Sequence, residues 1–407
     1  MKKVRFKRKV AVAGAGVVGG GVIQMLQSSP DVELATVLVR NKDKTRDGVP
    51  LKGVYLTTDF KDISNDKTID TVVEAMGGDG VALELIQACL ESGKSVITAN
   101  KLLLAKHPDL LAHANLRYEA ACAGGIPIVK SLRRDFADTI VGIEGILNGT
   151  TNFILSNMEH LDDTTYDAAL DMARESGFAE ADPTSDVDGF DAMYKLVILC
   201  RLGLGAVPDM DTIVRRGIRD VLPCDFKYAS MIGCTIRLVS TCWRDNDGVH
   251  AYVMPALVPL ISKFGKTAAA QNTIIVYSEL LGHTVYSGEG AGRGPTANSV
   301  VADLYDIPNR RQPLKTLDDG AFRANFQQRF FVRFRVHDGL GIVAALGTIC
   351  KEEEVSIDGI LQYPYFEDPM AFAVTTDMTT YEQITRVVRR MEAEEWCVHA
   401  FLCTIHY

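Results

Sequence analysis

The sequence lacks the features of a membrane protein, a disulfide-rich secreted protein or a zinc protein. No run of 18 or more apolar residues occurs, so no membrane span is expected. The nine cysteines include no CxxC pair and no Cys/His cluster, which indicates reduced, buried thiols and argues against a zinc site. The basic start, "MKKVRFKRKV", lacks the hydrophobic region of a signal peptide. We therefore expect a cytoplasmic protein.

An excess of positive charge is also absent. The formal net charge of -9 argues against a nucleic-acid partner. A hydrophobic content of 47% is ample for well-packed cores, and 407 residues are enough for two or three domains.

Short apolar strands alternate with helical patterns over the first 130 residues. This alternation predicts an α/β domain, residues 1–130, in which helices cover a parallel sheet. One helical pattern covers residues 81–94. The expected strands are 9–13, 33–40, 68–78 and 95–101.

A glycine-rich loop directly follows the first expected strand. Its spacing is G-x-G-x-x-G, in which the glycines allow a tight turn, close approach to a pyrophosphate and close helix packing. The next helix then presents its N-terminus to the phosphates. The pattern indicates a Rossmann-type dinucleotide site. The loop residues expected at the cofactor are Gly14, Ala15, Gly16, Val17, Val18 and Gly19.

The end of the second strand indicates which nicotinamide cofactor is preferred. Arg40 stands where NAD-preferring sites usually carry an acid, and Lys42 and Lys44 follow. A cation there favours the 2′-phosphate of NADP, although NAD remains possible. The alternative is an ordinary solvated loop, because Asp43 lies among these bases.

Three polar stretches follow. Lys101 comes just after an expected strand, at the sheet edge where ligands bind. The alternative interpretation is a plain surface lysine. The stretch "YEAACAGGIPIVKSL" (118–132) predicts an irregular backbone whose carbonyl groups could bind a cation, with Glu119 supplying negative charge. The alternative interpretation is a simple turn. The cluster "NGTTN" (148–152) could hydrogen-bond a zwitterion or a nicotinamide amide, or cap a helix.

The acid-rich stretch "ADPTSDVDGFDAMYKLVILC" (181–200) runs into an apolar helix. Asp191 and Lys195 share one face at i and i+4, with Asp188 as a suitable N-cap. The plain interpretation is a helix salt bridge. Burial disfavours the charged amine and Asp191 favours it, however, which predicts a group that transfers protons near neutral pH. Glu180 and Asp186 would then bind an ammonium group.

The remaining chain predicts two further domains. Residues 131–320 read as mixed α+β, and the polar segment 309–328 reads as a linker. From 328 to 407 the pattern is βαββαβ, a ferredoxin-like module.

Together these stretches resemble homoserine dehydrogenases over essentially the whole chain. The motifs that carry the resemblance are "TANK" (98–101), "EAACAGGIPIV" (119–129), "NGTTNFIL" (148–155), "GFAEADPTSDVDGFDAMYKL" (177–196) and "GRGPTANSVVADL" (292–304), with the glycine loop. The resemblance implies reversible, NAD(P)H-dependent reduction of L-aspartate 4-semialdehyde to L-homoserine, on the route to threonine, methionine and isoleucine.

The resemblance also implies roles for individual residues. Lys195 would protonate the carbonyl oxygen, Asp191 would orient it, and Lys101 would assist between nicotinamide and substrate. Glu180, Asp186, Thr150 and Lys101 would contact the substrate. Gly292 would lie in a segment, 290–310, that returns to the cofactor domain. A sodium or potassium ion would be bound mostly through backbone carbonyls in the loop of Glu119, Cys122, Gly124 and Ile126.

The tail resembles an ACT domain, a module that often senses amino acids. Leu340 stands where a proline is common, but Gly341 remains. The resemblance implies feedback by an amino acid such as threonine, or a role in assembly alone. It also implies a homodimer through the middle domain or a homotetramer through the tail.

Two alternatives differ in the chemistry they assign. One is another NADP-linked reductase of an amino-acid-derived aldehyde or ketone. The other is an amino-acid sensor whose enzyme domain has lapsed, against which the intact Lys101, Asp191 and Lys195 argue.

Overall fold

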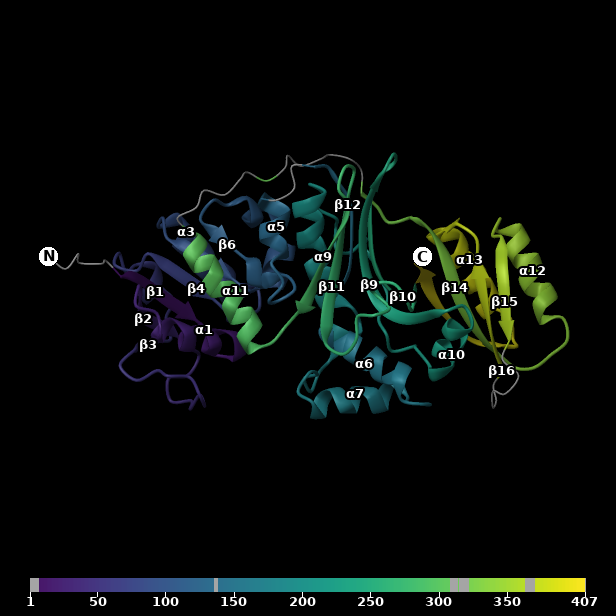
Figure 1. The fold of residues 1–407 in the computed structure, drawn as a ribbon, viewed down its shortest axis with the longest axis horizontal. Coiled ribbons are helices and arrows are strands. Elements are labelled where there is room, and N and C mark those ends of the chain that lie inside the picture. The colour runs from purple at the N-terminus through teal and green to yellow at the C-terminus, as the bar shows by residue number, and fades with distance from the viewer. Residues whose placement is uncertain (1–6, 135–137, 308–313, 315–321, 363–369, 407) are drawn as a thin grey trace. The chain divides into compact units, whose positions relative to one another are not determined.

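The described chain divides into two compact units. The computed structural model describes residues 7–134, 138–307, 314, 322–362 and 370–406. The first unit comprises Met1–Ile143, Tyr194–Val207 and Ile275–Asp319, and the second comprises Glu144–Met193, Pro208–Ile274 and Gly320–Tyr407. Each unit is therefore assembled from segments that are far apart in the sequence (Figure 1).

The first unit contains a parallel sheet of six strands. They are β1 (Arg8–Ala13), β2 (Val32–Leu38), β3 (Tyr55–Thr57), β4 (Thr71–Glu74), β5 (Ser95–Thr98) and β6 (Leu116–Arg117). Their order is β3-β2-β1-β4-β5-β6, and all neighbours are parallel. The order reverses between β1 and β4, as in a Rossmann sheet, and ligands bind at the carboxyl ends of strands beside such a reversal.

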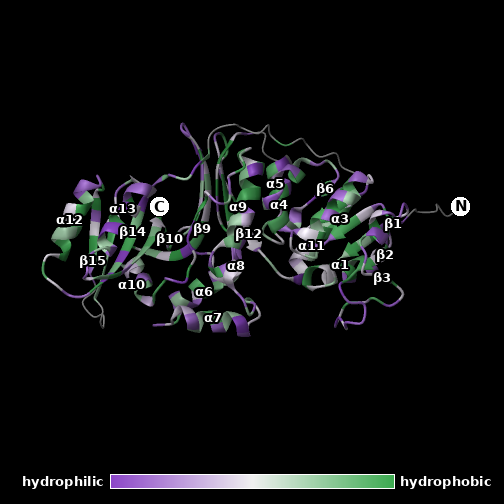
Figure 2. Ribbon diagram, turned by 180° about the vertical axis from the view of Figure 1, so that it is seen from behind, coloured by the Kyte–Doolittle hydropathy of each residue, from purple (hydrophilic) through white to green (hydrophobic). Residues whose placement is uncertain are grey.

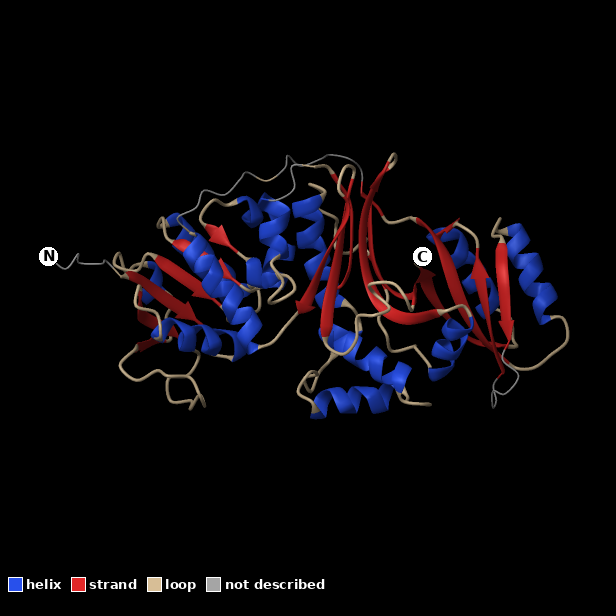
Figure 3. Ribbon diagram, in the orientation of Figure 1, coloured by secondary structure: helices blue, strands red, loops and turns tan. Residues whose placement is uncertain are grey.

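Helices accompany these strands in the first unit (Figure 3). They are α1 (Val17–Gln27), α2 (Lys61–Ser64), α3 (Gly80–Glu91), α4 (Lys101–Lys106), α5 (Ile128–Arg134) and α11 (Arg293–Asp306), with short 3-10 turns at Pro108–Ala112 and Glu119–Ala121. Although α11 is remote in sequence, it packs on α1 (Figure 1). Ala297, Val300 and Leu304 of α11 share a core with Val22 and Ile23 of α1.

The second sheet is mixed and has twelve strands. Its long strands before the tail are β7 (Ile140–Ile146), β9 (Cys234–Asp245), β10 (Gly248–Pro259), β11 (Gln271–Ser278) and β12 (Gly282–Glu289), with short strands β8 (Val214–Arg215) and β13 (Phe322–Arg323). The helices of this region are α6 (Gly149–His160), α7 (Tyr166–Glu175), α8 (Thr184–Val187), α9 (Phe190–Gly203) and α10 (Pro223–Met231).

The tail forms the βαββαβ module that its pattern predicts. Its elements are β14 (Gln327–Val336), α12 (Ile342–Glu352), β15 (Ile357–Gln362), β16 (Met370–Thr376), β17 (Thr379–Thr380), α13 (Tyr381–Glu392) and β18 (Cys397–Ile405). The order β18-β14-β16-β15 is that of a ferredoxin-like sheet, with antiparallel neighbours throughout.

The module is continuous with the rest of the second unit. β18 pairs in parallel with β10, with Ala256 opposite Thr404. Tyr252 and Met254 of β10 belong to the same hydrophobic core as Phe330 and Phe334 of β14. Figure 2 colours the ribbon of these strands by residue hydropathy. The tail therefore does not have a core to itself.

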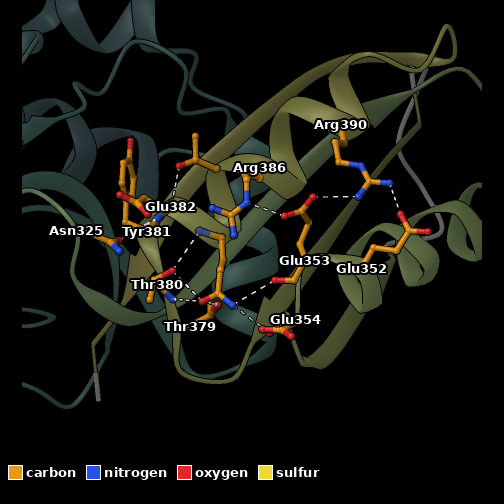
Figure 4. A network of polar contacts seen from close by, with 12 residues as sticks. Asn325, Glu352, Glu353, Glu354, Thr379, Thr380, Tyr381, Glu382, Arg386 and Arg390 are labelled. Atoms are coloured by element: carbon orange, nitrogen blue, oxygen red, sulfur yellow. Dashed lines mark hydrogen bonds and ion pairs between the residues drawn. The ribbon is translucent and has the colours of Figure 1, made fainter.

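A polar network joins the two helices of the tail (Figure 4). Glu353, at the C-terminal end of α12, accepts hydrogen bonds from Arg386 at 2.6 Å and Arg390 at 3.0 Å, both on α13. Hydrogen bonds from these two arginines hold the pKa of Glu353 below its usual range. The side-chain nitrogen of Gln383 donates to the Glu353 carbonyl, and its side-chain oxygen accepts from the Thr380 hydroxyl. The network fixes how α12 lies beside α13.

The predicted elements and the structure agree best where the sequence is periodic. The parallel sheet and the tail topology are confirmed. The division into three domains stays a prediction, and the linker 309–328 lies mostly outside the described residues.

Strand β9 was not predicted, because Arg237 interrupts its apolar pattern while being 1% exposed. Its guanidinium donates to Glu159 at 2.7 Å and to the Thr267 carbonyl.

Candidate active site

The glycine loop lies between β1 and the N-terminus of α1. Gly14 has a φ of 99°, and a Cβ there would lie 2.4 Å from the carbonyl oxygen of Ala75. A Cβ on Gly19 would lie 2.0 Å from the Gly14 carbonyl oxygen. In contrast, a Cβ on Gly16, the N-cap of α1, would meet no protein atom within 4 Å. The loop thus has two glycines required by packing and one that faces open space, where a phosphate fits.

A buried carboxyl group organises the neighbouring strand ends. Glu74, at the end of β4, is 0% exposed and accepts from the Met76 amide at 2.8 Å and the Thr98 hydroxyl at 2.6 Å. Burial raises the pKa of Glu74, against the effect of these hydrogen bonds. Asn100 caps α4 by accepting from Leu103 and donates to the Gly78 carbonyl at 2.6 Å. This frame fixes the start of α4, whose first residue is Lys101.

Arg40 is exposed beyond the end of β2. Among the described residues it has no hydrogen bond or ion pair. The neighbouring cations are occupied, since Lys42 lies 5.9 Å from the Tyr55 ring centroid and Arg46 donates to the carbonyls of Asn41 and Lys44. Arg40 is thus available to an anion at this edge.

In the second unit, one asparagine joins two of the expected site acids. Asn148 caps α6 by accepting from the Thr151 amide at 2.8 Å. Its side-chain nitrogen donates to Asp186 at 2.7 Å and to Asp191 at 2.8 Å. The two carboxylates, five residues apart in the sequence, therefore share one amide group.

Asp191 and Lys195 lie one turn apart on α9, as predicted. Asp191 is 3% exposed, Lys195 is 6% exposed, and Asp191 is in the first turn of the helix, where a carboxylate is favoured. The backbone carbonyl of Lys195 lies 3.9 Å from the Cys122 sulfur. The helix starts at Phe190, so the expectation that Asp188 is its N-cap is wrong. Asp188 instead pairs with Arg219 at 2.5 Å.

Thr150 and Glu180 are linked through the segment between them. The Thr150 hydroxyl donates to the Phe178 carbonyl at 2.9 Å, and the Phe178 ring packs on Phe153 with centroids 4.7 Å apart. These contacts hold the turn that precedes Glu180, whose side chain is exposed.

Comparison with known proteins gives separate evidence on the family of this chain. The family model described as "Homoserine dehydrogenase, NAD binding domain" matches residues 14–124, and the one described as "Homoserine dehydrogenase" matches residues 127–305. The homoserine dehydrogenase of Mycobacterium leprae (strain TN) is 36% identical over 394 residues, which cover 88% of this chain and 87% of the relative. That of Bacillus subtilis (strain 168) is 34% identical, with 89% and 88% covered.

A solved structure of a homoserine dehydrogenase from Thiobacillus denitrificans covers 98% of this chain and 98% of its own. It is 32% identical to this chain and superposes with a TM-score of 0.90. The chain belongs to the homoserine dehydrogenase family. The enzyme is an NAD(P)-dependent oxidoreductase that interconverts L-aspartate 4-semialdehyde and L-homoserine.

The loop of residues 119–126, where a cation is expected, has a mixed set of partners. Both Glu119 oxygens accept backbone amides, from Val129 at 2.9 Å and Lys130 at 2.7 Å, so this carboxylate caps α5. The Gly124 carbonyl accepts from the Ser299 hydroxyl at 2.7 Å. Each carbonyl oxygen has a second lone pair for a cation. In the described ranges, no cluster of three or more His, Cys, Asp or Glu side chains suits a metal ion.

Gly292 is the exposed N-cap of α11, with a φ of 113°. The segment that follows belongs to the first unit, through the packing of α11 on α1. None of the helices in the described ranges has the length and apolar character to cross a bilayer.

Two residues of the site were missed or left open by the sequence. Glu74 was taken as part of an apolar strand, and its only signal was an acid within "TVVEAMGG". Asn148 had two interpretations, as a ligand contact or a cap. The structure shows the cap and adds the contacts to Asp186 and Asp191, which no spacing rule predicts because they join a loop to two separate helices.

Proposed function

We propose that Lys195 is the proton donor and acceptor of the homoserine dehydrogenase reaction, and that Asp191 orients it. The support is their burial, 6% and 3% exposed, one turn apart on one helix. In homoserine oxidation the Lys195 amine takes the proton of the C4 hydroxyl group, and in the reverse direction it returns a proton to the carbonyl oxygen. General acid–base catalysis by an amine at this place, one helical turn from the Asp191 carboxylate, serves both directions of the reaction.

The dinucleotide is held by the glycine loop, with its pyrophosphate at the N-terminus of α1. When bound, NAD(P) takes up or supplies the hydride. The contacts proposed are those of the loop residues Gly14 to Gly19, Arg40, Lys101 and Gly292. The open space in front of Gly16 supports this assignment. Arg40, exposed and without a partner among the described residues, supports a preference for the 2′-phosphate of NADP.

Lys101 assists by placing positive charge near the oxygen that becomes an alkoxide. Its position at the N-terminus of α4, after the carboxyl end of β5, supports this role. Glu180 and Asp186 bind the ammonium group of the substrate, and Thr150 contacts it or orders the 178–180 segment. The hydrogen bond from Thr150 to the Phe178 carbonyl supports the second possibility for Thr150.

A monovalent cation, Na⁺ or K⁺, is bound by the loop of Glu119, Cys122, Gly124 and Ile126, through backbone carbonyls. Positive φ angles at Ala123 and Gly124, 54° and 51°, support this, because they bend the loop sharply. Activity measured in sodium, potassium and a bulky organic cation tests the site. Equal rates in all three would argue against it.

The tail acts as an ACT domain that binds an amino acid such as threonine. Gly341 has a φ of 89° and caps α12, and Leu340 beside it is fully exposed, so backbone at this turn is accessible to a ligand. Activity in millimolar threonine tests the effector. The proposed homodimer or homotetramer is tested by light scattering on full-length and tail-truncated protein.

The observation that carries the proposed mechanism is the buried Asp191–Lys195 face of α9. Homoserine oxidation followed at 340 nm, with NADP and NAD separately, tests it in the wild type and in Lys195→Met. General acid–base groups contribute about 10²- to 10⁴-fold, so kcat is expected to fall by that factor. Lys227→Met, which removes an exposed helical lysine, is the control. An active Lys195→Met enzyme would refute the role.

A further inference from the structure

The side chain of Asn148 uses both of its N–H donors and its oxygen in hydrogen bonds within the site. Its oxygen accepts from the Thr151 amide at 2.8 Å, and its nitrogen donates to Asp186 and Asp191 at 2.7 and 2.8 Å. The amide orientation follows from these partners, since a backbone N–H requires the oxygen and two carboxylates require the NH₂ group. Asn148 is 4% exposed, so its amide is shielded from water.

The backbone around Asn148 holds this amide in place. The Asn148 carbonyl accepts from the Thr151 hydroxyl at 3.1 Å and from the Asn152 amide at 3.3 Å. Gly149, the next residue, lies against Ala270, where a Cβ would approach the carbonyl oxygen to 2.6 Å. Asn152 is anchored in turn through the carbonyls of the 267–271 loop. The packed start of the helix therefore fixes the position of the Asn148 side chain, which is the donor.

The two carboxylates that share this amide have different positions. Asp186 is half-buried on the short helix α8, whereas Asp191 is 3% exposed in the first turn of α9. Like charges that converge on one point repel, and a donor between them offsets that repulsion and fixes both rotamers. A helix cap alone would need only the oxygen of Asn148, and serine provides that equally well.

We propose that Asn148 is a positioning residue that sets the recognition of a primary ammonium group by this site. It holds Asp186 where the α-amino group of the substrate binds, and it holds Asp191 for its work with Lys195. This inference rests on the proposed roles of Asp186 and Asp191. It predicts that Asn148 governs the preference for an amino-acid alcohol over the same alcohol without its amino group.

The experiment compares homoserine with 4-hydroxybutyrate, its deaminated analogue, in steady-state oxidation. Competitive inhibition by 4-hydroxybutyrate replaces turnover where turnover is too slow. Asn148→Ser keeps the helix cap but lacks the reach to the acids, and Asn148→Asp keeps cap and shape but replaces the donor with an acceptor. Thr165→Ala, which removes the cap of α7, is the control for a helix-cap loss remote from these acids.

In Asn148→Ser we expect kcat/KM for homoserine to fall about 10- to 100-fold, the loss typical of a hydrogen bond to a charged group, while KM for the cofactor stays unchanged. The preference for homoserine over 4-hydroxybutyrate falls by a similar factor. Asn148→Asp is expected to lose more than Asn148→Ser. Thr165→Ala changes thermal stability but not the preference.

Three outcomes would overturn the inference. Equal losses for both ligands in Asn148→Ser would make Asn148 a general structural residue, and no loss at all would make it a cap only. Wild-type behaviour of Asn148→Asp would show that the donor has no role.

The variant Asp186→Asn separates the proposed role of Asp186 from the inference on Asn148. If it leaves the preference unchanged, the role of Asp186 is wrong, whereas if it lowers the preference and Asn148→Ser does not, only the inference on Asn148 fails.

Discussion

A fully buried ion pair joins the tail to the rest of the second unit, in addition to the strand pairing and the shared core. Arg333 on β14 donates to Asp225 on α10 at 2.7 Å, with the two side chains 1% and 0% exposed. Arg333 also donates to the Asp220 carbonyl at 2.8 Å, and Asp225 accepts from the Leu222 amide at 2.8 Å. Burial raises the pKa of Asp225, and the guanidinium opposes that rise.

Arg333→Met is the perturbation that tests this pair. It leaves the Asp225 carboxyl in the interior without its counter-ion, which costs about 3–5 kcal/mol of unfolding free energy. Lys227→Met is the matched control, because Lys227 is on the same helix and its pair with Asp163, at 2.8 Å, is exposed. Such exposed pairs contribute at most about 1 kcal/mol. The two pairs have nearly the same distance, but their side chains are 1% and 0% exposed in the first and 44% and 75% exposed in the second, so burial decides the magnitude.

The destabilisation by Arg333→Met should also depend on pH. Without the arginine, the folded-state pKa of Asp225 lies further above its unfolded value. A carboxyl group shifted in this direction gives stability at low pH that is lost as the pH rises through the folded pKa. The difference between variant and wild type is thus expected to be larger at pH 8 than at pH 5.

Urea unfolding followed by tryptophan fluorescence measures this difference. The sequence has two tryptophans, Trp243 on β9 and Trp396 before β18, and both lie in the second unit. Adding Asp225→Asn to Arg333→Met should recover most of the loss, because Asn keeps an acceptor for Leu222 without a charge. A loss below about 1 kcal/mol for Arg333→Met, or one that is the same at both pH values, would refute the reasoning.

Three further predictions concern the cofactor site and the tail. Gly16→Ala should weaken cofactor binding about tenfold without changing thermal stability. Gly19→Ala should weaken cofactor binding and also lower the free energy of unfolding by about 1–3 kcal/mol. Measuring KM for NADP and the melting curve of each variant separates the two effects. Arg40→Asp should lower the NADP-to-NAD ratio of kcat/KM at least about tenfold, and an unchanged ratio would remove Arg40 from the 2′-phosphate site. Thr380→Ala, which breaks the capping box of α13, should cost about 1 kcal/mol in urea unfolding, with the exposed Thr348→Ala as the neutral comparison.

Local sequence was enough to predict the two most regular parts of the molecule. The strand–glycine loop–helix pattern at residues 9–27 predicts β1 and α1, because only glycine tolerates the contacts found at Gly14 and Gly19. The period of two along 329–336 and the helical period that follows predict the tail topology. The i, i+4 spacing of Asp191 and Lys195 likewise needs nothing beyond the geometry of a helix.

Tertiary structure decided the features that depend on distant segments. Strand β9 carries a buried Arg237, which is stable there only because Glu159 and the 267 carbonyl arrive from elsewhere in the chain. The pairing of Arg333 with Asp225 and of α11 with α1 is equally invisible to local patterns.

The same division holds at the site. The sequence by itself determined which acids and lysines are present and which of them share a helix face. That Asn148 collects Asp186 and Asp191, and that Glu74 is buried beneath the strand ends, was decided only when the chain folded. The physical reason is that a hydrogen bond extends about 3 Å in space, whereas sequence periodicity reports contacts only within one helix or strand.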